Sequence, residues 1–273
     1  MSTADNTAAA REAVAEVPLW YHTLEVAPGV TTPGWFDLRP IIGLMPWPDV
    51  RGKRCLDVGT YDGFLAFELE RRGATEVLAA DIGLHEDWDW PFAMRQRGPE
   101  WLREHAGSEP GTGFKVASEL LGSSVQRVTI SAYDLSPEAV GQFDVVVCGS
   151  LLLHLRDPLR ALAAIHSVCR GRFLSSETID LRLTVTARQQ PVLRLDGLSE
   201  IFQWFVPNAA AHRRMLDASG FGIERASRPY AIPFGVSHPP RGRSLRSLPT
   251  AAGRRIWAGG DGVPHQALLA SPV

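Results

Sequence analysis

Two carboxylates and two glycines near residue 60 have the types and the spacing of a nucleoside-binding site. Asp57 lies in an apolar run, Gly59 and Gly63 frame a short turn, and Asp81 ends the next apolar run. Glycines let the backbone of such a turn approach a ligand closely. A carboxylate at the end of the second strand can accept hydrogen bonds from both ribose hydroxyls of an adenosine. Because the glycines do not follow G-x-G-x-x-G, we expect no pyrophosphate clamp.

The elements that must position these residues alternate between strands and helices. We expect strands over 54–58, 76–81, 126–130, 143–150, 172–177, 221–226 and 230–235, and helices over 63–72, 114–121 and 208–219, with a further helix after Pro158. This order predicts an α/β fold: a Rossmann-like, doubly wound, mostly parallel sheet of seven strands.

Three parts of the chain are expected from its composition. Residues 1–50 form a lead segment rich in Trp, Pro and Gly, which could cover the site as a lid. Residues 51–236 form the core domain, and its insert at 83–124 provides a helical cap. Residues 237–273 are rich in Arg, Ser, Pro and Gly, so we expect a tail that is ordered only in part.

A second stretch adds a family resemblance. Residues 143–180 run from a strand through Leu-Leu-Leu-His and Arg-Asp-Pro into a helix, and the next strand ends at Glu177. Together with the turn at 59–63, this stretch resembles motifs I, IV and V of the class I S-adenosylmethionine-dependent methyltransferases. The lead YHTLEVAPGVTTPGW and residues 204–226 are similar to the tRNA wobble-uridine (5-oxyacetate-forming) carboxymethyl/methyltransferase family and its small-molecule relatives. The resemblance implies S-adenosylmethionine as cofactor and S-adenosylhomocysteine as product.

The same resemblance implies a set of cofactor-binding residues. The first turn meets the amino-acid end of the cofactor, Asp81 meets its ribose, and the segments after the third and fourth core strands meet the adenine and the cofactor floor. The expected residues are Asp57, Gly59, Thr60, Asp62, Gly63, Phe64, Asp81, Ile82, Tyr133, Asp134, Cys148, Gly149, Ser150 and Leu151.

Three residues are candidates for a general base. His154 follows the strand at 143–150, His22 lies in the lead segment, and Glu177 ends a strand. Histidine titrates near neutrality, which suits proton transfer. Each has an alternative, because many methyl transfers need no base: local hydrogen bonding for His154, packing of the lead segment for His22, and a solvated carboxylate at a strand end for Glu177.

Aromatic residues predict the substrate wall. The candidates are Trp20, Tyr21, Trp88, Trp90, Trp204 and Asn208. Packing within the lead segment and the insert is the alternative for the aromatic residues, and helix capping is the alternative for Asn208. Arg39 and Arg194 are candidates for the basic pocket that a carboxylated cofactor would need.

Composition limits the partners. The net charge of −2 favours a small molecule over nucleic acid. We expect no metal, because no Cys-x-x-Cys or histidine cluster is present, and no membrane partner, because no long apolar run occurs. The N-terminus does not resemble a secretory signal, so we expect a cytoplasmic protein; the oligomeric state is not predicted.

These observations favour an enzyme that methylates a small molecule at O, N or C in bacterial specialised metabolism. Three alternatives remain open from the sequence. The first is a methyl- or carboxymethyltransferase of the tRNA wobble-uridine type, and the second is transfer of another group from the sulfonium. The third is a nucleoside-binding protein without turnover.

Overall fold

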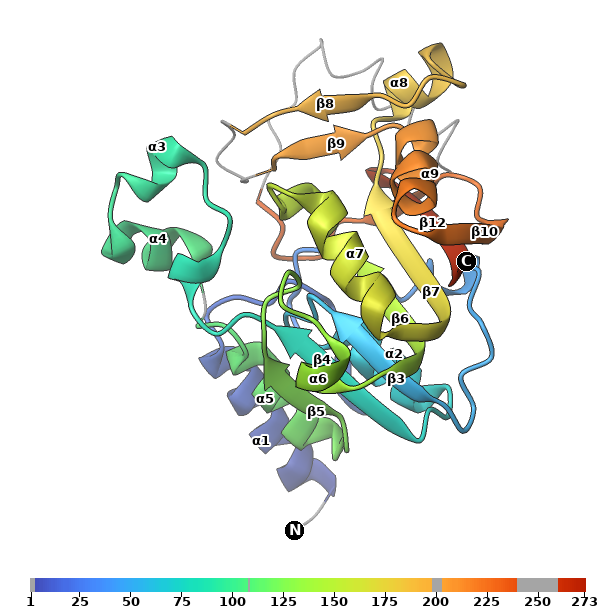
Figure 1. The fold of residues 1–273 in the computed structure, drawn as a ribbon. Coiled ribbons are helices and arrows are strands. Elements are labelled where there is room, and N and C mark those ends of the chain that lie inside the picture. Colours follow the sequence, from blue (N-terminus) through green and yellow to red (C-terminus); the bar gives the residue numbers. More distant parts are fainter. Residues whose placement is uncertain (1–2, 108, 198–202, 240–259) are drawn as a thin grey trace.

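A twisted sheet with helices on both faces forms the centre of the molecule in the computed structural model (Figure 1). The structure describes residues 3–107, 109–197, 203–239 and 260–273. In these residues the sheet has eight strands: β3 (Arg54–Val58), β4 (Glu76–Asp81), β5 (Gln126–Thr129), β6 (Phe143–Gly149), β7 (Cys169–Thr178), β10 (Phe221–Ala226), β11 (Tyr230–Pro233) and β12 (Gly262–Pro272).

The sheet is mostly parallel, as the sequence predicts. Its order is β10-β12-β7-β6-β3-β4-β5, and β11 pairs with β12. The strands from β7 to β5 pair in parallel, whereas β12 runs antiparallel to β7, β10 and β11. All seven expected strands are present, including β11 at 230–233, and β12 is an eighth strand that the sequence did not predict.

Strand β12 lies inside the segment that was expected to be a tail. It inserts between β7 and β10, and Ala267, Leu268, Leu269 and Ala270 are fully buried there. Successive side chains point to opposite faces, so Leu268 joins one hydrophobic core and Leu269 the other. A strand that is buried on both faces belongs to the core domain.

Helices complete the two cores and the outer parts of the molecule. They are α1 (Thr3–Glu16), α2 (Phe64–Arg71), α3 (Phe92–Arg95), α4 (Pro99–Ala106), α5 (Thr112–Leu121), α6 (Pro137–Val140), α7 (Pro158–Val168), α8 (Leu181–Thr186) and α9 (Ala209–Ala218), with short 3-10 turns η1 (Ile42–Leu44), η2 (His85–Asp87) and η3 (Leu152–His154). Helices α1, α2 and α5 pack on one face of the sheet, and α6, α7 and α9 pack on the other.

The insert at 83–124 divides into two parts. Helix α5 packs against the core through Phe114 and Ala117. Helices α3 and α4 instead project from the body and bury a small cluster of their own, around Trp90 and Leu102 (Figure 1). The projecting part is the cap that the sequence predicts.

Two small ribbons accompany the core. Strands β1 (Glu25–Ala27) and β2 (Val30–Thr31) pair within the lead segment, and β8 (Leu193–Leu195) pairs with β9 (Phe205–Pro207) beyond the end of β7. Among the described residues, we find no helix with the length and apolar character needed to cross a bilayer.

Candidate active site

A cavity of about 1250 Å³ lies at the carboxyl ends of the parallel strands. Each of these strands contributes to its wall through a residue at or just beyond its end: Gly59, Asp81, Ile130, Gly149 and Thr178. Open α/β sheets bind ligands at this edge. The volume exceeds the roughly 300–1,000 Å³ of ordinary small-molecule pockets, so the cavity has room for a cofactor beside a substrate.

Segments far apart in the chain cover this cavity. Tyr21, His22 and residues 35–45 of the lead segment form one wall, and residues 87–89 of the insert form another. Helix α8, the start of β12 and Arg194 of β8 close the remaining side. In Figure 1 the arrowhead of β7 points toward α8, so α8 lies beyond the carboxyl end of this strand.

The turn between β3 and α2 depends on its two glycines. Gly59 has φ +77° and Gly63 has φ +93°, in the left-handed region that favours glycine. A Cβ on Gly63 would lie 2.4 Å from a ring carbon of Phe67. Tyr61 between them also has a positive φ, 49°, which is uncommon for a residue with a side chain and is often found at functional sites.

Asp81 is held in a fixed orientation at the end of β4. Its Oδ2 accepts a hydrogen bond of 2.6 Å from the backbone N–H of Tyr61, and its Oδ1 accepts one of 2.8 Å from Ile82. Burial raises the pKa of this carboxyl. Each oxygen keeps acceptor capacity, and the residue lines the cavity. This arrangement fits a ligand that carries paired hydroxyl groups, such as the ribose of S-adenosylmethionine.

Asp62, an expected cofactor residue, binds the lead segment. The carboxylate is buried and accepts hydrogen bonds of 2.9 Å from the backbone N–H groups of Tyr21 and His22. Its other oxygen pairs with Nδ1 of the His22 ring. The carboxylate therefore fixes the proton on Nδ1 and leaves Nε2 as the acceptor of a ring that lines the cavity.

Asp57 and Glu177 are buried beneath the cavity and do not line it. Glu177 Oε1 accepts hydrogen bonds of 3.3 Å from the backbone of Leu151 and Leu152, so this residue supports the loop after β6. Glu177 is thus displaced from the direct proton-transfer role expected of it. Burial raises the pKa of Glu177 to about 8 and that of Asp57 to about 7.

The expected cofactor residues fall into two groups. Those that line the cavity are Gly59, Asp81, Ile82, Tyr133, Gly149, Ser150 and Leu151, and those that lie outside its wall are Asp57, Thr60, Asp62, Gly63, Phe64, Asp134 and Cys148. Phe64 and Cys148 belong to the two hydrophobic cores. Asp134 is exposed and lies 3.5 Å from Arg160.

The expected substrate residues are also divided. Tyr21 and Trp88 line the cavity, whereas the other four brace the structure around it. Three indoles donate to backbone carbonyls: Trp20 to Val14, Trp90 to His85 and Trp204 to Asp89. Asn208 caps α9 by accepting the N–H of Ala211 at 2.8 Å, which is the alternative that the sequence left open.

Of the remaining candidates, His154 lines the cavity within η3. Arg194 also lines it and pairs with Asp180 at 3.1 Å. Arg39 lies outside the wall, where its Nε and Nη2 groups donate to the two carboxylate oxygens of Asp37.

Sequence reasoning missed His265, which comes from the start of β12. Its Nε2 lies 2.6 Å from Ser150 Oγ and 3.1 Å from Thr178 Oγ1, and all three residues line the cavity. The available signal was the position of this histidine two residues before the apolar run at 267–270. An apolar run of that kind predicts a buried strand.

Comparisons with known proteins agree with this geometry. A family described as a methyltransferase domain matches residues 38–226. A ubiquinone biosynthesis O-methyltransferase of Acinetobacter baumannii is 30% identical over 201 residues, which cover 65% of this chain and 73% of that enzyme. The enzyme of the same name from Pseudomonas syringae pv. tomato is 31% identical over 148 residues; these cover 50% of this chain and 53%, about half, of that relative.

A tRNA U34 carboxymethyltransferase of Helicobacter acinonychis is also similar. It is 24% identical over 197 residues, which cover 68% of this chain and 72% of that enzyme. Among solved structures, Burkholderia thailandensis 1,6-didemethyltoxoflavin-N1-methyltransferase, with bound 1,6-didemethyltoxoflavin and S-adenosylhomocysteine, is 16% identical, with a TM-score of 0.50. This match covers 100% of this chain and 81% of that one, and it shows a shared fold.

Proposed function

Because the chain belongs to the methyltransferase-domain family and is an S-adenosylmethionine-dependent methyltransferase, we propose that it methylates a small apolar molecule. The observation that carries this proposal is the single cavity of about 1250 Å³. One part of its wall holds Asp81 and the glycine turn. Another part is formed by apolar side chains such as Phe36, Ile41 and Val206.

Residues at the strand ends are proposed to hold the cofactor. Asp81 accepts hydrogen bonds from the ribose hydroxyls, Gly59 permits close approach of the backbone, and Ile82 and Tyr133 border the adenine. Gly149, Ser150 and Leu151 form the floor. When bound, S-adenosylmethionine supplies an electrophilic methyl group on a sulfonium.

His22 is the proposed general base. The Asp62 carboxylate holds the Nδ1 proton of its ring, so Nε2 is available to take a proton from the acceptor. His154 is a second candidate, since it also lines the cavity. Tyr21 and Trp88 are proposed to border the substrate, and the lead segment and α8 exclude water from it.

A largely apolar cavity supports a small acceptor over a folded RNA. The net charge of −2 supports the same choice, because nucleic-acid binding depends on many Lys and Arg contacts to phosphates. The relatives named ubiquinone biosynthesis O-methyltransferase support it as well. We place the reaction in bacterial specialised metabolism.

One observation favours a second candidate, a carboxymethyltransferase of the tRNA wobble-uridine type. Arg194 lines the cavity, where a guanidinium could bind a carboxylated cofactor, and one relative is named tRNA U34 carboxymethyltransferase. The Asp180 carboxylate already pairs with Arg194, which weakens this candidate.

A screen of hydrophobic hydroxyl, amine and carbon acceptors tests the proposal. We expect acceptor-dependent formation of S-adenosylhomocysteine and a product that gains the mass of a methyl group. A product that gains a carboxymethyl group, or strong salt-dependent binding of tRNA, would reject the small-molecule methyltransferase in favour of the second candidate.

A further inference from the structure

Ser150, Thr178 and His265 form a polar cluster in a wall that is otherwise largely apolar. Ser150 follows β6, Thr178 ends β7, and His265 lies near the start of β12. The cluster therefore joins two parallel strands to the antiparallel strand that returns from the C-terminal segment. All three residues line the cavity, and His265 is only 4% exposed.

Hydrogen bonds determine which nitrogen of His265 carries the proton. Nδ1 lies 2.8 Å from the carbonyl oxygen of Val263, and a carbonyl can only accept. The proton is therefore on Nδ1, and Nε2 is the acceptor. Burial lowers the pKa of His265 to about 4, so the ring is neutral at physiological pH.

The neutral ring in turn orients the hydroxyl of Ser150. The Ser150 proton can be donated to His265 Nε2 at 2.6 Å or to the Ser176 carbonyl at 3.4 Å, and the shorter contact is the stronger. With its proton directed to His265, Ser150 Oγ presents lone pairs and no proton to a further partner. It can then accept a hydrogen bond from a ligand.

The position of Ser150 indicates which ligand group it meets. Gly149 and Leu151, on either side of it, are the proposed cofactor floor, while Ile179 and Val263, next to Thr178 and His265 of the cluster, belong to the apolar part of the wall. Ser150 thus lies where the two proposed parts of the cavity adjoin, and this is where an acceptor atom must meet the methyl group.

We propose that Ser150 binds the acceptor hydroxyl of an apolar alcohol or phenol, and that His265 is the positioning residue that makes Ser150 an acceptor. This inference rests on the proposed function and specifies its substrate class. A neutral hydroxyl fits Ser150 better than an ammonium group, because the hydrogen-bond partners of Ser150 Oγ are His265 Nε2 and the Ser176 carbonyl, and neither is a carboxylate that would balance a positive charge. The acceptor proton is donated to Ser150 Oγ in the bound state and leaves to His22 during transfer.

A matched pair of probes tests the inference by binding, without turnover. In the presence of saturating S-adenosylhomocysteine, para-tert-butylphenol is titrated beside para-tert-butyltoluene, in which a methyl replaces the hydroxyl. We expect the wild-type protein to bind the phenol about tenfold more tightly, as one hydrogen bond to a buried group allows. Equal affinity for the two probes, or binding of neither, would overturn the inference.

Variants then locate the hydroxyl subsite. Ser150→Ala and His265→Leu should each reduce the preference for the phenol to roughly twofold or less. Ser150→Ala removes the acceptor oxygen, and His265→Leu frees the Ser150 proton to point toward the ligand. His265→Gln should restore part of it, since the amide oxygen can accept from Ser150. Thr178→Val is the matched control in the same cluster and should keep the preference. A preference that survives in Ser150→Ala would place the hydroxyl elsewhere.

Two further readouts separate the causes of failure. Ring-nitrogen NMR of His265 should show the neutral Nδ1–H tautomer, with Nε2 perturbed by the phenol and not by the toluene. If S-adenosylhomocysteine itself fails to bind, the proposed function fails. If it binds and the phenol preference is absent, only the hydroxyl subsite fails.

Discussion

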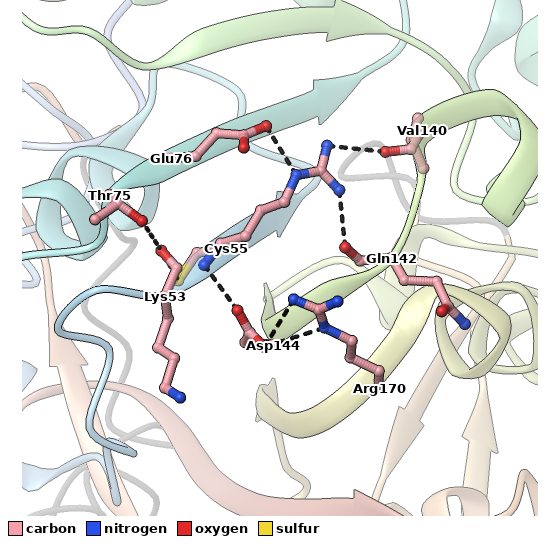
Figure 2. Close-up of polar contacts among 9 residues, drawn as sticks. Lys53, Cys55, Thr75, Glu76, Val140, Gln142, Asp144 and Arg170 are labelled. Carbon is pink, nitrogen blue, oxygen red and sulfur yellow. Dashed lines mark hydrogen bonds and ion pairs between the residues drawn. The ribbon is translucent and has the colours of Figure 1, made fainter.

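The amino ends of β3 and β6 pair their polar groups with one another, whereas the carboxyl ends of the same strands place polar groups around a cavity. At the amino ends, Asp144 accepts the backbone N–H of Arg54 at 3.0 Å and pairs with Arg170 at 3.0 Å. The Arg54 side chain binds Glu76 and the carbonyls of Val140 and Gln142. Figure 2 shows Asp144 and Arg170 within this network.

At the carboxyl ends of the strands, some buried polar groups have no such pairing. Among the described residues, Asp57 Oδ2 and Glu177 Oε2 are buried side-chain oxygens without a hydrogen-bond partner. The pKa values of the two ends also move in opposite directions: the backbone hydrogen bond from Arg54 lowers that of Asp144, and burial raises those of Asp57, Asp81 and Glu177. One end stabilises the fold, and the other retains groups that suit ligand binding.

The largest effect is expected at His22. The variant His22→Ala should lower kcat about 100-fold or more, in the range for loss of a general base, and leave affinity for S-adenosylhomocysteine nearly unchanged. Asp62→Asn should also lower kcat strongly: its amide oxygen still accepts from the backbone of the lead segment, but its N–H group, turned toward Nδ1, favours the tautomer with the proton on Nε2. Steady-state kinetics, with an acceptor found in the screen, measure kcat for both variants. Calorimetry measures their affinity for S-adenosylhomocysteine. A loss of cofactor affinity with kcat retained would assign His22 to the cofactor instead.

The next largest effect is the pH dependence of the free energy of unfolding, to which Glu177 contributes. Its folded pKa of about 8 lies above the ordinary value of 4.5, so the folded state binds the extra proton between these values. The free energy of unfolding should therefore fall by several kcal/mol as the pH rises from 4.5 to 8. Glu177→Gln keeps an acceptor for Leu151 and Leu152 and should make the fall smaller, leaving the part that the raised pKa of Asp57 contributes. Denaturant unfolding across that pH range tests it, and identical pH profiles for the two proteins would contradict the assignment.

Asp81→Ala should weaken cofactor binding by about 1.5–3 kcal/mol, through lost hydrogen bonds to a charged carboxylate. The unliganded variant should also lose about 1–3 kcal/mol of unfolding free energy, because the N–H groups of Tyr61 and Ile82 lose their acceptors. The shift in melting temperature that S-adenosylhomocysteine produces measures the loss. A full shift in the variant would remove Asp81 from the site.

Asp144→Asn, at the opposite end of the strands, should lower the free energy of unfolding by about 1 kcal/mol near neutral pH, with no change in cofactor affinity. Since the folded pKa of Asp144 lies below its ordinary value of 3.8, its contribution is present above that pH and lost as the pH falls through the folded pKa. Acid unfolding of the wild type and the variant should therefore converge at low pH. A change in cofactor affinity would mean that the two ends are coupled.

Much of the fold is predictable because the relevant signals are local. The runs Arg54–Val58 and Phe143–Gly149 consist mainly of apolar residues, and the glycines at 59 and 63 take the positive φ values that the turn requires. Strand β12 was harder to assign, because residues rich in Arg, Pro and Gly precede it and its partner β7 lies about a third of the chain away.

The site was less predictable because its decisive contacts join residues distant in sequence. Asp62 is 40 residues from His22, and Ser150 is 115 residues from His265. The family resemblance places Asp62 and Ser150 near a ligand by position along the chain. It does not reveal that the Asp62 carboxylate binds the lead segment, or that a histidine from the last strand orients Ser150.

Calorimetric titration with S-adenosylhomocysteine tests the central claim most directly, with the wild type, Asp81→Ala and Asp144→Asn measured side by side. If the carboxyl ends of the strands form the cofactor site, the wild type and Asp144→Asn bind with equal, micromolar affinity, and Asp81→Ala binds at least about tenfold more weakly. Absence of binding to the wild type, or equal binding by all three proteins, would contradict the claim.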